Sequence, residues 1–581
     1  MVALRKRGTA WVLEPTRCGA RAAAHLHLLY HVSIHITSWN TPMRLRPSVL
    51  AATAFSLSFS AFAQEAPTLK EPALRAHLSF LADDLLEGRG TGQRGGELTV
   101  RYLETQAAAI GLQPMPGGGY RQPVPIQGTR LVSGSVVFDA GGKRIAPKPG
   151  DQIVFGTASG KTEVAFDAPL VFVGYGVSAP EEKWDDYKGQ DVKGKILVMM
   201  VDDPQPTAEE PNRFAGKAYT WYGRWVYKFE EAARRGAAGA LLIHTTPSAS
   251  YAWSVPANSF SHERFRLAGP GNPIEGWLQE DTARALFAAA GFDLDTLRAQ
   301  AERRDFKPVE LKTAARVQMT STVRQVEQFN VVGIVPGTDP KLKEQAVVYS
   351  AHWDHFGIDE KLGSGRDHVF NGAIDNATGT AALLAMAAEA VRKPARRTQV
   401  FLWPAAEEQG LLGSAAYVAN PVVPLAKTAA DLNLDSLNFV GRTKDIGVPG
   451  AERSSLYETA AGVAKKMGLK LAPSIPDMSG AYFRADHFSF AKAGVPAFNV
   501  GSAVFSGDGH FTFEHDQAHA SAQMVGFKKD YHQVSDEYRP EWDLSGMLQQ
   551  AQFTLNLGYA VANAPAMPTW KKGDPFGSVK R

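Results

Sequence analysis

The stretch AVVYSAHWDH at residues 346–355 joins an uninterrupted apolar run to a cluster of polar side chains. Short apolar runs of this kind are typical of strands buried on both faces of a parallel sheet. Similar runs recur along the chain and are separated by helical patterns. The runs lie at residues 399–403, 429–434 and 497–500, and the helical patterns at residues 378–391, 411–418 and 455–467. This alternation predicts an α/β fold with a mixed, mostly parallel sheet flanked by helices.

Carboxylates and histidines follow several of these predicted strands or flank the helices. The set consists of His352, Asp354, Asp375, Glu407, Glu408, Asp435 and His532. Taken alone, each has an ordinary structural explanation: Asp375 can cap the helix that follows it, and Glu407 and Glu408 can begin a solvated helix. Functional groups gather at the carboxyl ends of parallel strands, however, so their joint occurrence at one sheet edge favours a common site.

The chemistry of this set fits two divalent metal ions. Asp375, Glu408 and Asp435 supply three negative charges, which together with one bridging hydroxide balance two divalent cations. His352 and His532 add neutral nitrogen donors. Oxygen and imidazole ligands without thiolate suit two Zn²⁺ ions, although manganese or cobalt would also fit. Paired metals activate water and polarise a carbonyl, which indicates hydrolysis.

Two further residues are expected to support the metals. Asp354 follows His352 by two positions, so in extended backbone both side chains leave on one face, and the carboxylate can orient the imidazole. Glu407 and Glu408 are adjacent and therefore diverge. One can bind metal while Glu407 reaches the bound water as general base.

These motifs resemble those of the M28 family of di-zinc aminopeptidases, and all of them occur in the family's order. They are His352-x-Asp354, Asp375-Asn-Ala-Thr-Gly, Glu407-Glu408-x-Gly410, Asp435 and Tyr531-His532. The resemblance implies one zinc on His352, Asp375 and Asp435, and a second on Asp375, Glu408 and His532. It also implies Glu407 as base, Asp354 as the partner of His352, and a cis peptide after Asp375. Asn376 stands where the family often has Asp.

The resemblance extends to the domain organisation. Residues 64–121 form an expected N-terminal helical segment with a Gly- and Arg-rich break at residues 87–96. Residues 122–323 are β-rich and resemble an inserted protease-associated (PA) domain. Residues 324–563 form the expected catalytic domain, and the proline-containing tail at residues 564–581 is expected to be loosely ordered.

The first 63 residues are expected to be a leader. Met43 opens a pattern of basic residues, an apolar core and Ala61-Phe-Ala63, which is typical of a signal peptide at residues 43–63 with translation starting at Met43. An organelle-type presequence is the alternative. The mature protein is expected to be periplasmic or secreted, with no stable membrane anchor after cleavage. The full chain has a single cysteine, Cys18, and it lies in the leader. The mature protein is therefore expected to have no thiol chemistry.

Charge gives no indication of a nucleic-acid partner. The chain of 581 residues has 62 basic and 59 acidic residues, and seven of the basic residues but only one acidic residue lie in the leader. The body is thus close to neutral, and the expected partners are peptide substrates. The sequence leaves the oligomeric state open.

The predicted function is a zinc-dependent exopeptidase that removes N-terminal residues through a metal-bridging hydroxide. Two alternatives keep the metals and change the substrate: a carboxypeptidase acting on acidic C-termini, and a glutaminyl cyclase. The carboxypeptidase would need cationic groups, for which Arg453 and Arg484 are candidates. Tyr482, Asp486 and His487 are candidates for shaping the pocket. A non-catalytic receptor-like protein is the fourth possibility.

Overall fold

The computed structural model describes residues 5–7, 10–12, 65–362, 367–473, 475–501 and 511–581. The chain divides into two units, residues 1–60 and residues 61–581. In the first unit, β1 (Arg5–Arg7) and β2 (Ala10–Val12) form an antiparallel pair. The predicted signal peptide, its cleavage site and Cys18 lie outside the described residues. Among the described residues, no helix has the length and apolar character needed to cross a membrane.

A mixed sheet runs through the second unit. Five of its strands follow the spatial order β21–β18–β14–β17–β13. Their bounds are β13 (Val309–Val335), β14 (Ala346–Ser350), β17 (Thr398–Trp403), β18 (Thr428–Leu434) and β21 (Ala497–Val500). Strands β21, β18, β14 and β17 are parallel, and β13 is antiparallel to β17. The predicted mostly parallel sheet is therefore confirmed.

Helices cover both faces of these strands. Val347 and Tyr349 of β14 pack in the layer that contains α8 and α13, whereas Val348 packs with Tyr417 of α9 and Phe490 of α11. This alternation follows from the two-residue period of a strand buried on both faces. The helix bounds are α1 (Glu71–Leu81), α2 (Arg94–Ile110), α8 (Thr378–Arg392), α9 (Leu412–Ala419), α10 (Leu456–Lys466), α11 (His487–Lys492), α12 (Gln517–Asp530) and α13 (Ser545–Asn563).

Residues 141–308, here called the inserted lobe, contain parallel strands and helices as well as antiparallel strands. The strands β6, β9, β10 and β12 are parallel, and β5 adds an antiparallel edge. Their bounds are β5 (Ile153–Gly156), β6 (Glu163–Phe172), β9 (Ile196–Met200), β10 (Gly239–His244) and β12 (Ile274–Gln279). The accompanying helices are α3 (Trp225–Arg234), α4 (Thr246–Ala249), α5 (Ser254–Ser261), α6 (Glu280–Ala289) and α7 (Leu294–Ala301).

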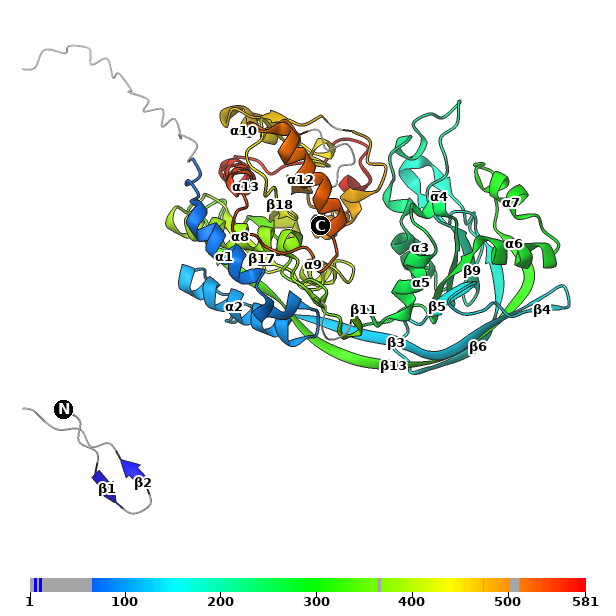
Figure 1. Cartoon of the computed structure of the whole chain (residues 1–581). Helices are drawn as coiled ribbons and strands as arrows, with labels where there is room; N and C mark the ends of the chain where they lie inside the picture. The colour runs from blue at the N-terminus through cyan, green and yellow to red at the C-terminus, as the bar shows by residue number, and fades with distance from the viewer. Residues whose placement is uncertain (1–4, 8–9, 13–64, 363–366, 474, 502–510) are drawn as a thin grey trace, which may run out of the picture. The chain divides into compact units, whose positions relative to one another are not determined.

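Residues 65–120 and 336–581, here called the main lobe, are joined to the inserted lobe by two long strands. Strands β3 (Arg121–Ala140) and β13 run from one lobe to the other (Figure 1) and pair along most of their length. The domain boundaries predicted at residues 122 and 323 stay a prediction, and both positions lie within these continuous strands. The remaining short strands are β4 (Lys143–Ile145), β7 (Ser178–Ala179), β8 (Trp184–Asp185), β11 (Arg264–Leu267), β15 (Gly357–Ile358), β16 (Val369–Phe370), β19 (Asp445–Ile446) and β20 (Lys470–Leu471).

Two local expectations were wrong. The helix break was expected to extend to Gly96, but α2 begins at Arg94, because Gly95 and Gly96 allow the helix to pack closely on the preceding loop; a Cβ on Gly95 would lie 2.0 Å from the Leu86 carbonyl oxygen. The tail at residues 564–581 was expected to be loose. It is instead anchored by aromatic residues: the Trp570 indole donates to the Gly494 carbonyl at 2.7 Å, and Phe576 is buried.

Candidate metal centre

The predicted site residues come together at the carboxyl edge of the parallel strands. His352 and Asp354 follow β14, and Asp435 follows β18. Glu407 and Glu408 lie in the loop after β17. Asp375 lies in the turn at Ala373–Ala377, three residues before the start of α8, and His532 follows α12. Neighbouring parallel strands end at the same edge, which is why residues far apart in sequence meet here.

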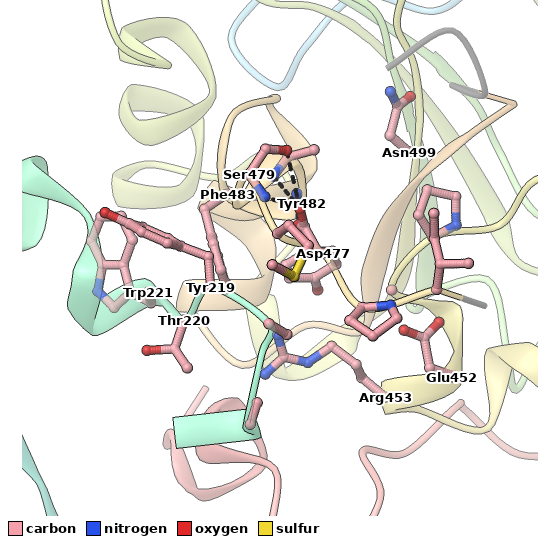
Figure 2. A pocket seen from close by; sticks show the side chains of 18 of the residues that line it. Tyr219, Thr220, Trp221, Glu452, Arg453, Asp477, Ser479, Tyr482, Phe483 and Asn499 are labelled. Atoms are coloured by element: carbon pink, nitrogen blue, oxygen red, sulfur yellow. Dashed lines mark hydrogen bonds between the residues drawn. The ribbon is translucent and has the colours of Figure 1, made fainter. Parts of the chain in front are cut away.

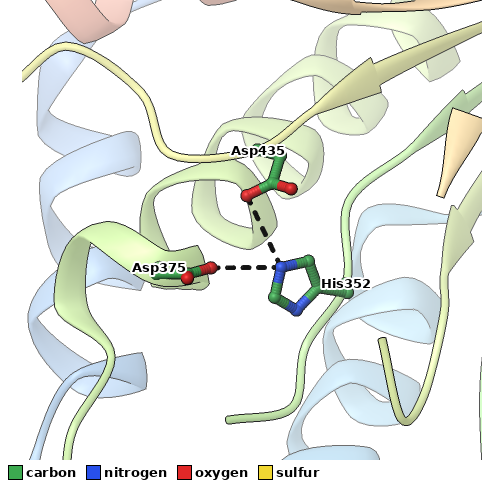
Figure 3. A group of neighbouring side chains, drawn as sticks. All are labelled: His352, Asp375 and Asp435. Atoms are coloured by element: carbon green, nitrogen blue, oxygen red, sulfur yellow. Dashed lines mark ion pairs between the residues drawn. The ribbon is translucent and has the colours of Figure 1, made fainter. Parts of the chain in front are cut away.

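The first group consists of His352, Asp375 and Asp435, which point toward one another (Figure 3). Nε2 of His352 lies 3.3 Å from Oδ1 of Asp375 and 3.6 Å from Oδ1 of Asp435. One potential ligand atom from each residue lies within 4.8 Å of the others.

The second group uses the other oxygen of Asp375. Oδ2 of Asp375 lies 3.2 Å from Nε2 of His532, which is itself 3.4 Å from Oε2 of Glu408. Asp375 therefore presents one carboxylate oxygen to each group. His355, which the sequence reasoning did not assign to the site, also belongs here, because its Nδ1 lies 2.6 Å from Oε1 of Glu408.

The donor sets fit divalent cations. Among the described residues, the buried Nε2 atom of His352 has no hydrogen-bond partner, although carboxylate oxygens of Asp375 and Asp435 lie 3.3 and 3.6 Å from it. An imidazole nitrogen with neighbouring carboxylates but no hydrogen bond is suited to share a cation with them. Imidazole and carboxylate donors also suit zinc.

The protonation equilibria reflect a high density of negative charge. Burial alone lowers the pKa of His532, but Glu408 and Asp375 outweigh it and raise that pKa to about 9. His352 behaves similarly: burial opposes protonation, and Glu407, Asp375 and Asp435 raise its pKa well above the usual value. Burial raises the pKa of Asp375, but its contacts with His352 and His532 hold it well below its ordinary value. Concentrated carboxylates of this kind favour a bound cation.

Glu407 differs from the carboxylates in the two groups. It is half-buried, and burial raises its pKa well above the ordinary value, with Asp435 and Glu408 adding to the effect and His352 opposing it. Its backbone N–H donates to Oδ1 of Asp354 at 3.0 Å. A carboxylate with a raised pKa next to acidic groups has the property required of a general base that must later release its proton.

Asp354 lies next to the imidazole that it is expected to orient, and its role stays a prediction. Nδ1 of His352 is 3.2 Å from the backbone carbonyl of Asp354 and 3.8 Å from its carboxylate. The carboxylate also accepts the Glu407 N–H, so it links the loop that carries His352 to the loop that carries Glu407.

Loop contacts fix the position of Asp375. The Asp375-Asn376 peptide is cis, as the family resemblance implies. The Asn376 amide donates to the Leu434 carbonyl at 2.9 Å, which joins this loop to the one that carries Asp435. The buried carboxylate of Asp536 accepts the N–H groups of Ile374 and Asp375 at distances of 3.0 to 3.2 Å. The sequence analysis assigns Asp536 no role.

A cavity of about 1060 Å³ lies close to the candidate centre and is lined by both lobes (Figure 2). Tyr219 and Trp221 come from the inserted lobe, and Tyr482 and Phe483 from the main lobe. Asn499 also lines the cavity, and its amide donates to the Asp435 carbonyl at 3.4 Å. The cavity thus extends to a neighbour of one candidate metal ligand.

Other residues that the sequence suggested for the pocket have different surroundings. His487 lines the cavity, and burial lowers its pKa to about 3. Asp486 is fully buried. Arg453 lines the cavity, but its Nε donates to Asp574 at 2.7 Å. Arg484 is exposed and donates to the Ser479 carbonyl.

Comparison with known proteins supports the motif analysis. Residues 330–555, which include every predicted site residue, match the model of Peptidase family M28. The resemblance inferred from the motifs is therefore confirmed for this segment.

Curated relatives match a similar part of the chain. Leucine aminopeptidase 1 of Trichoderma harzianum is 28% identical over 249 residues, which cover 40% of this chain and 54% of that protein. A probable leucine aminopeptidase of Arthroderma otae is 29% identical over 234 residues, covering 36% and 59%. The chain thus spans little more than half the length of these relatives. Among solved structures, an aminopeptidase from Aneurinibacillus sp. strain AM-1 is similar with a TM-score of 0.46 and 18% identity, covering 86% of this chain and 95% of that one.

Proposed function

We propose that this chain, whose residues 330–555 match peptidase family M28, is a metal-dependent exopeptidase that removes N-terminal residues from peptides. The observation that carries the proposal is the position of Asp375, whose two carboxylate oxygens face two separate groups of histidine and carboxylate side chains. Such an arrangement suits a pair of divalent cations that share one carboxylate.

We assign one zinc to His352, Asp375 and Asp435 and the other to Asp375, Glu408 and His532. The contacts within each group support this assignment. His355 would then orient Glu408 through Oε1 of that carboxylate, whereas Oε2 faces His532. When bound, two such ions lower the pKa of water and polarise a carbonyl.

The protein's own groups would carry the proton transfers. Glu407 would accept a proton from the attacking water and deliver it to the leaving amine. Asp354 would hold the Glu407 backbone through the hydrogen bond to its N–H. Asn376 and Asp536 would keep Asp375 in place between the two groups.

The cavity supports a peptide substrate with apolar side chains. Aromatic residues from both lobes line it, and Asn499 connects it to the loop that carries Asp435. A concave, largely aromatic site of this size suits an apolar side chain of a peptide.

Among the residues that the structure describes, no contact specifically favours the alternative functions. A carboxypeptidase would need a cationic group for the terminal carboxylate. Arg453 is engaged with Asp574 and also lies over the rings of Tyr482 and Phe576, 4.9 and 4.8 Å from their centroids. A receptor-like protein without catalysis would have no use for both complete groups of ligands.

We further propose that the mature protein acts in the periplasm or outside the cell. The signal-peptide pattern at residues 43–63 supports this location. Sequencing of the N-terminus of the processed protein should give Gln64 as its first residue; a start before residue 43 would refute the proposed processing.

The test compares the zinc-loaded protein with Glu407→Gln on aminoacyl-arylamides and on N-terminally blocked peptides. We expect cleavage only of substrates with a free amine. Glu407→Gln should retain two zinc ions and lose activity by about 10²- to 10⁴-fold, the usual contribution of a general base. Glu344→Gln, an exposed site on the same lobe, is the matched control. A fully loaded protein that cleaves no free-amine substrate would refute the aminopeptidase.

A further inference from the structure

We propose that Arg89 is a positioning residue for the metal centre, whose buried guanidinium fastens the loop that carries His352 to the loop that carries Asp375. The proposal rests on the proposed function only in requiring that this centre bind metal. Arg89 belongs to the Glu87–Gly92 stretch of the N-terminal segment, in the 3₁₀ helix at Asp84–Arg89. The chemistry described so far gives this stretch no role.

The side chain of Arg89 donates four hydrogen bonds, all of them to backbone carbonyls. It is 1% exposed, and its Nε donates to the Trp353 carbonyl at 2.8 Å, next to His352. Its Nη1 donates to the carbonyls of Leu81 and Asn371, each at 2.5 Å. Its Nη2 donates to the Gly372 carbonyl at 2.8 Å, three residues before Asp375. One planar group therefore joins α1 and both loops.

The backbone around Arg89 is built for this close approach. Gly88 has a φ of +64°, and a Cβ there would lie 2.4 Å from the Phe370 carbonyl oxygen and 2.7 Å from that of Gly357. The Arg89 carbonyl accepts the His355 N–H at 3.4 Å. The glycine thus brings the N-terminal segment against the two loops, and the arginine then bonds to them.

An arginine suits this position better than a lysine. Its fork of fixed donors can satisfy several carbonyls at once, whereas an ammonium group is a compact point charge on a flexible stem. Because every observed bond of the Arg89 guanidinium goes to a main-chain carbonyl, it occupies none of the carboxylate or imidazole atoms assigned to the metals.

The charge of Arg89 also matters for the centre. Burial lowers its pKa to about 10, and the negative charges of Asp536, Asp354, Asp375 and Glu408 oppose that decrease. The guanidinium therefore remains protonated at neutral pH and offsets part of the repulsion among these carboxylates. Groups that orient metal ligands typically contribute about 10- to 100-fold to metal affinity or activity.

A matched control distinguishes this role from general stabilisation. Arg397 is also a buried arginine of the main lobe, 1% exposed, and it donates to the carbonyls of Val561 and Ala564. It lies just before β17, at the edge of the sheet opposite to Glu407. Arg397→Met should therefore reduce thermal stability without affecting the metals.

The experiment measures zinc affinity by competition with a chelator, and the thermal midpoint, for the full chain, Arg89→Met and Arg397→Met. We expect Arg89→Met to bind zinc about 10- to 100-fold more weakly, whereas Arg397→Met binds it as the parent does. At saturating zinc, Arg89→Met should show a lower kcat with unchanged KM, because Arg89 does not contact substrate. Equal zinc affinity of Arg89→Met and the parent would overturn the proposal.

Two milder variants keep the test decisive if Arg89→Met does not fold. Arg89→Lys retains the charge but cannot reach all three segments, so it should show an intermediate loss of zinc affinity. Gly88→Ala retains the arginine but displaces it, and should also weaken zinc binding; parent-like affinity in both would overturn the proposal. A parent that takes up no zinc would refute the assignment of zinc to this centre and, with it, the role of Arg89 in zinc binding. A parent that binds two zinc ions alongside an equally tight Arg89→Met would refute the Arg89 proposal alone.

Discussion

Two histidines approach Glu408 from different sides, and their exposure differs. The His355 side chain is fully buried and lies 2.6 Å from Oε1 of Glu408, whereas the His532 side chain is 33% exposed and faces Oε2 of Glu408 together with Asp375. The buried ring is suited to orient the carboxylate. The more exposed ring is suited to complete the second metal site, because it contacts both of that site's carboxylates.

The first prediction concerns His532. In His532→Ala, the first group keeps its three residues while the second loses the imidazole assigned to its metal, so zinc content should fall from two ions to one per chain after gel filtration. Activity should fall with it. The exposed His515→Ala is the matched control and should retain two ions. If His532→Ala retained two ions, His355 would be the ligand.

Most of the residues assigned from sequence share one property: they can be placed relative to a strand or helix that is itself predictable. His532 is an exception, because it follows α12, which the sequence analysis does not predict. His352 and Asp435 follow buried apolar strands directly, and Asp375 precedes an Ala-rich helix. Arg89 and Asp536 could not be assigned in this way. Their roles depend on contacts with loops far away in sequence, such as that between Arg89 and Gly372, and no local pattern encodes those contacts.

A buried charge cluster in the inserted lobe gives a second prediction at the residue scale. Lys228 is fully buried and donates to the carbonyls of Tyr175 and Asp202. Burial raises the pKa of Asp203 to about 7, although Lys228 opposes the increase. In the unfolded chain this carboxyl titrates near its ordinary value of about 4. The folded protein therefore holds a proton on Asp203 between about pH 4 and 7 that the unfolded chain has released.

The stability conferred by protonated Asp203 is thus lost as pH rises through this window. Asp203→Asn cannot titrate, so its unfolding free energy relative to the parent should increase from pH 5 to pH 7, by roughly 1.4 kcal/mol for each unit of pKa difference crossed. Urea unfolding at the two pH values measures the change. Asp191→Asn, at an exposed position, should show no such trend. A relative stability of Asp203→Asn that is constant or decreases with pH would contradict the prediction.

At the scale of elements, a short segment of the inserted lobe forms one wall of the cavity. It is the 3₁₀ helix at Trp221–Gly223 with its flanking residues. Both oxygens of Asp203 accept from Thr220, through its N–H and its hydroxyl, at 2.8 Å. The Trp221 ring lies 4.7 Å from that of Phe488 in the main lobe, measured between centroids. The segment is therefore held by its own lobe and packs on the other.

The third prediction follows from this wall. Trp221→Ala should raise KM for peptides with bulky apolar side chains by roughly tenfold, because removing an apolar contact from a pocket commonly costs about 1–3 kcal/mol. The kcat and zinc content should change little, since the metal-ligand loops are untouched. The matched control is Trp253→Ala. Trp253 lies in the inserted lobe, and its indole N–H donates to the Gly150 carbonyl. An unchanged KM in Trp221→Ala would exclude this wall from substrate binding.

How well the sequence predicted each strand depended on which of its residues are buried. The strands at β14, β17, β18 and β21 are buried at every position, and sequence located each to within about one residue. The continuous length of β13 was not predicted. Its residues 310–317 alternate between buried and exposed positions, and such a pattern defines a strand but not where it crosses from one lobe to the next.

At the scale of the whole molecule, one sheet serves both lobes. Strand β13 pairs with β17 of the main lobe through residues 331–335 and with β6 of the inserted lobe through parts of residues 309–320. The inserted lobe is thus tied to the metal-bearing lobe by backbone hydrogen bonds as well as by side-chain packing. Every residue assigned to the metals nevertheless lies in the main lobe.

The last prediction separates these two contributions. Leu131 of β3 pairs with Ser321 of β13, so residues 132–320 can be replaced by Asn-Gly, which favours a two-residue hairpin turn. The shortened chain loses the pairing of β11 with β3, and its thermal midpoint should fall. It should still bind two zinc ions and cleave small aminoacyl-arylamides with a kcat close to that of the parent. Its KM for longer apolar peptides should rise, because the wall around Trp221 is gone. The same excision in Glu407→Gln should be inactive. A folded, shortened chain that failed to bind zinc would instead mean that the inserted lobe holds the metal-ligand loops in place.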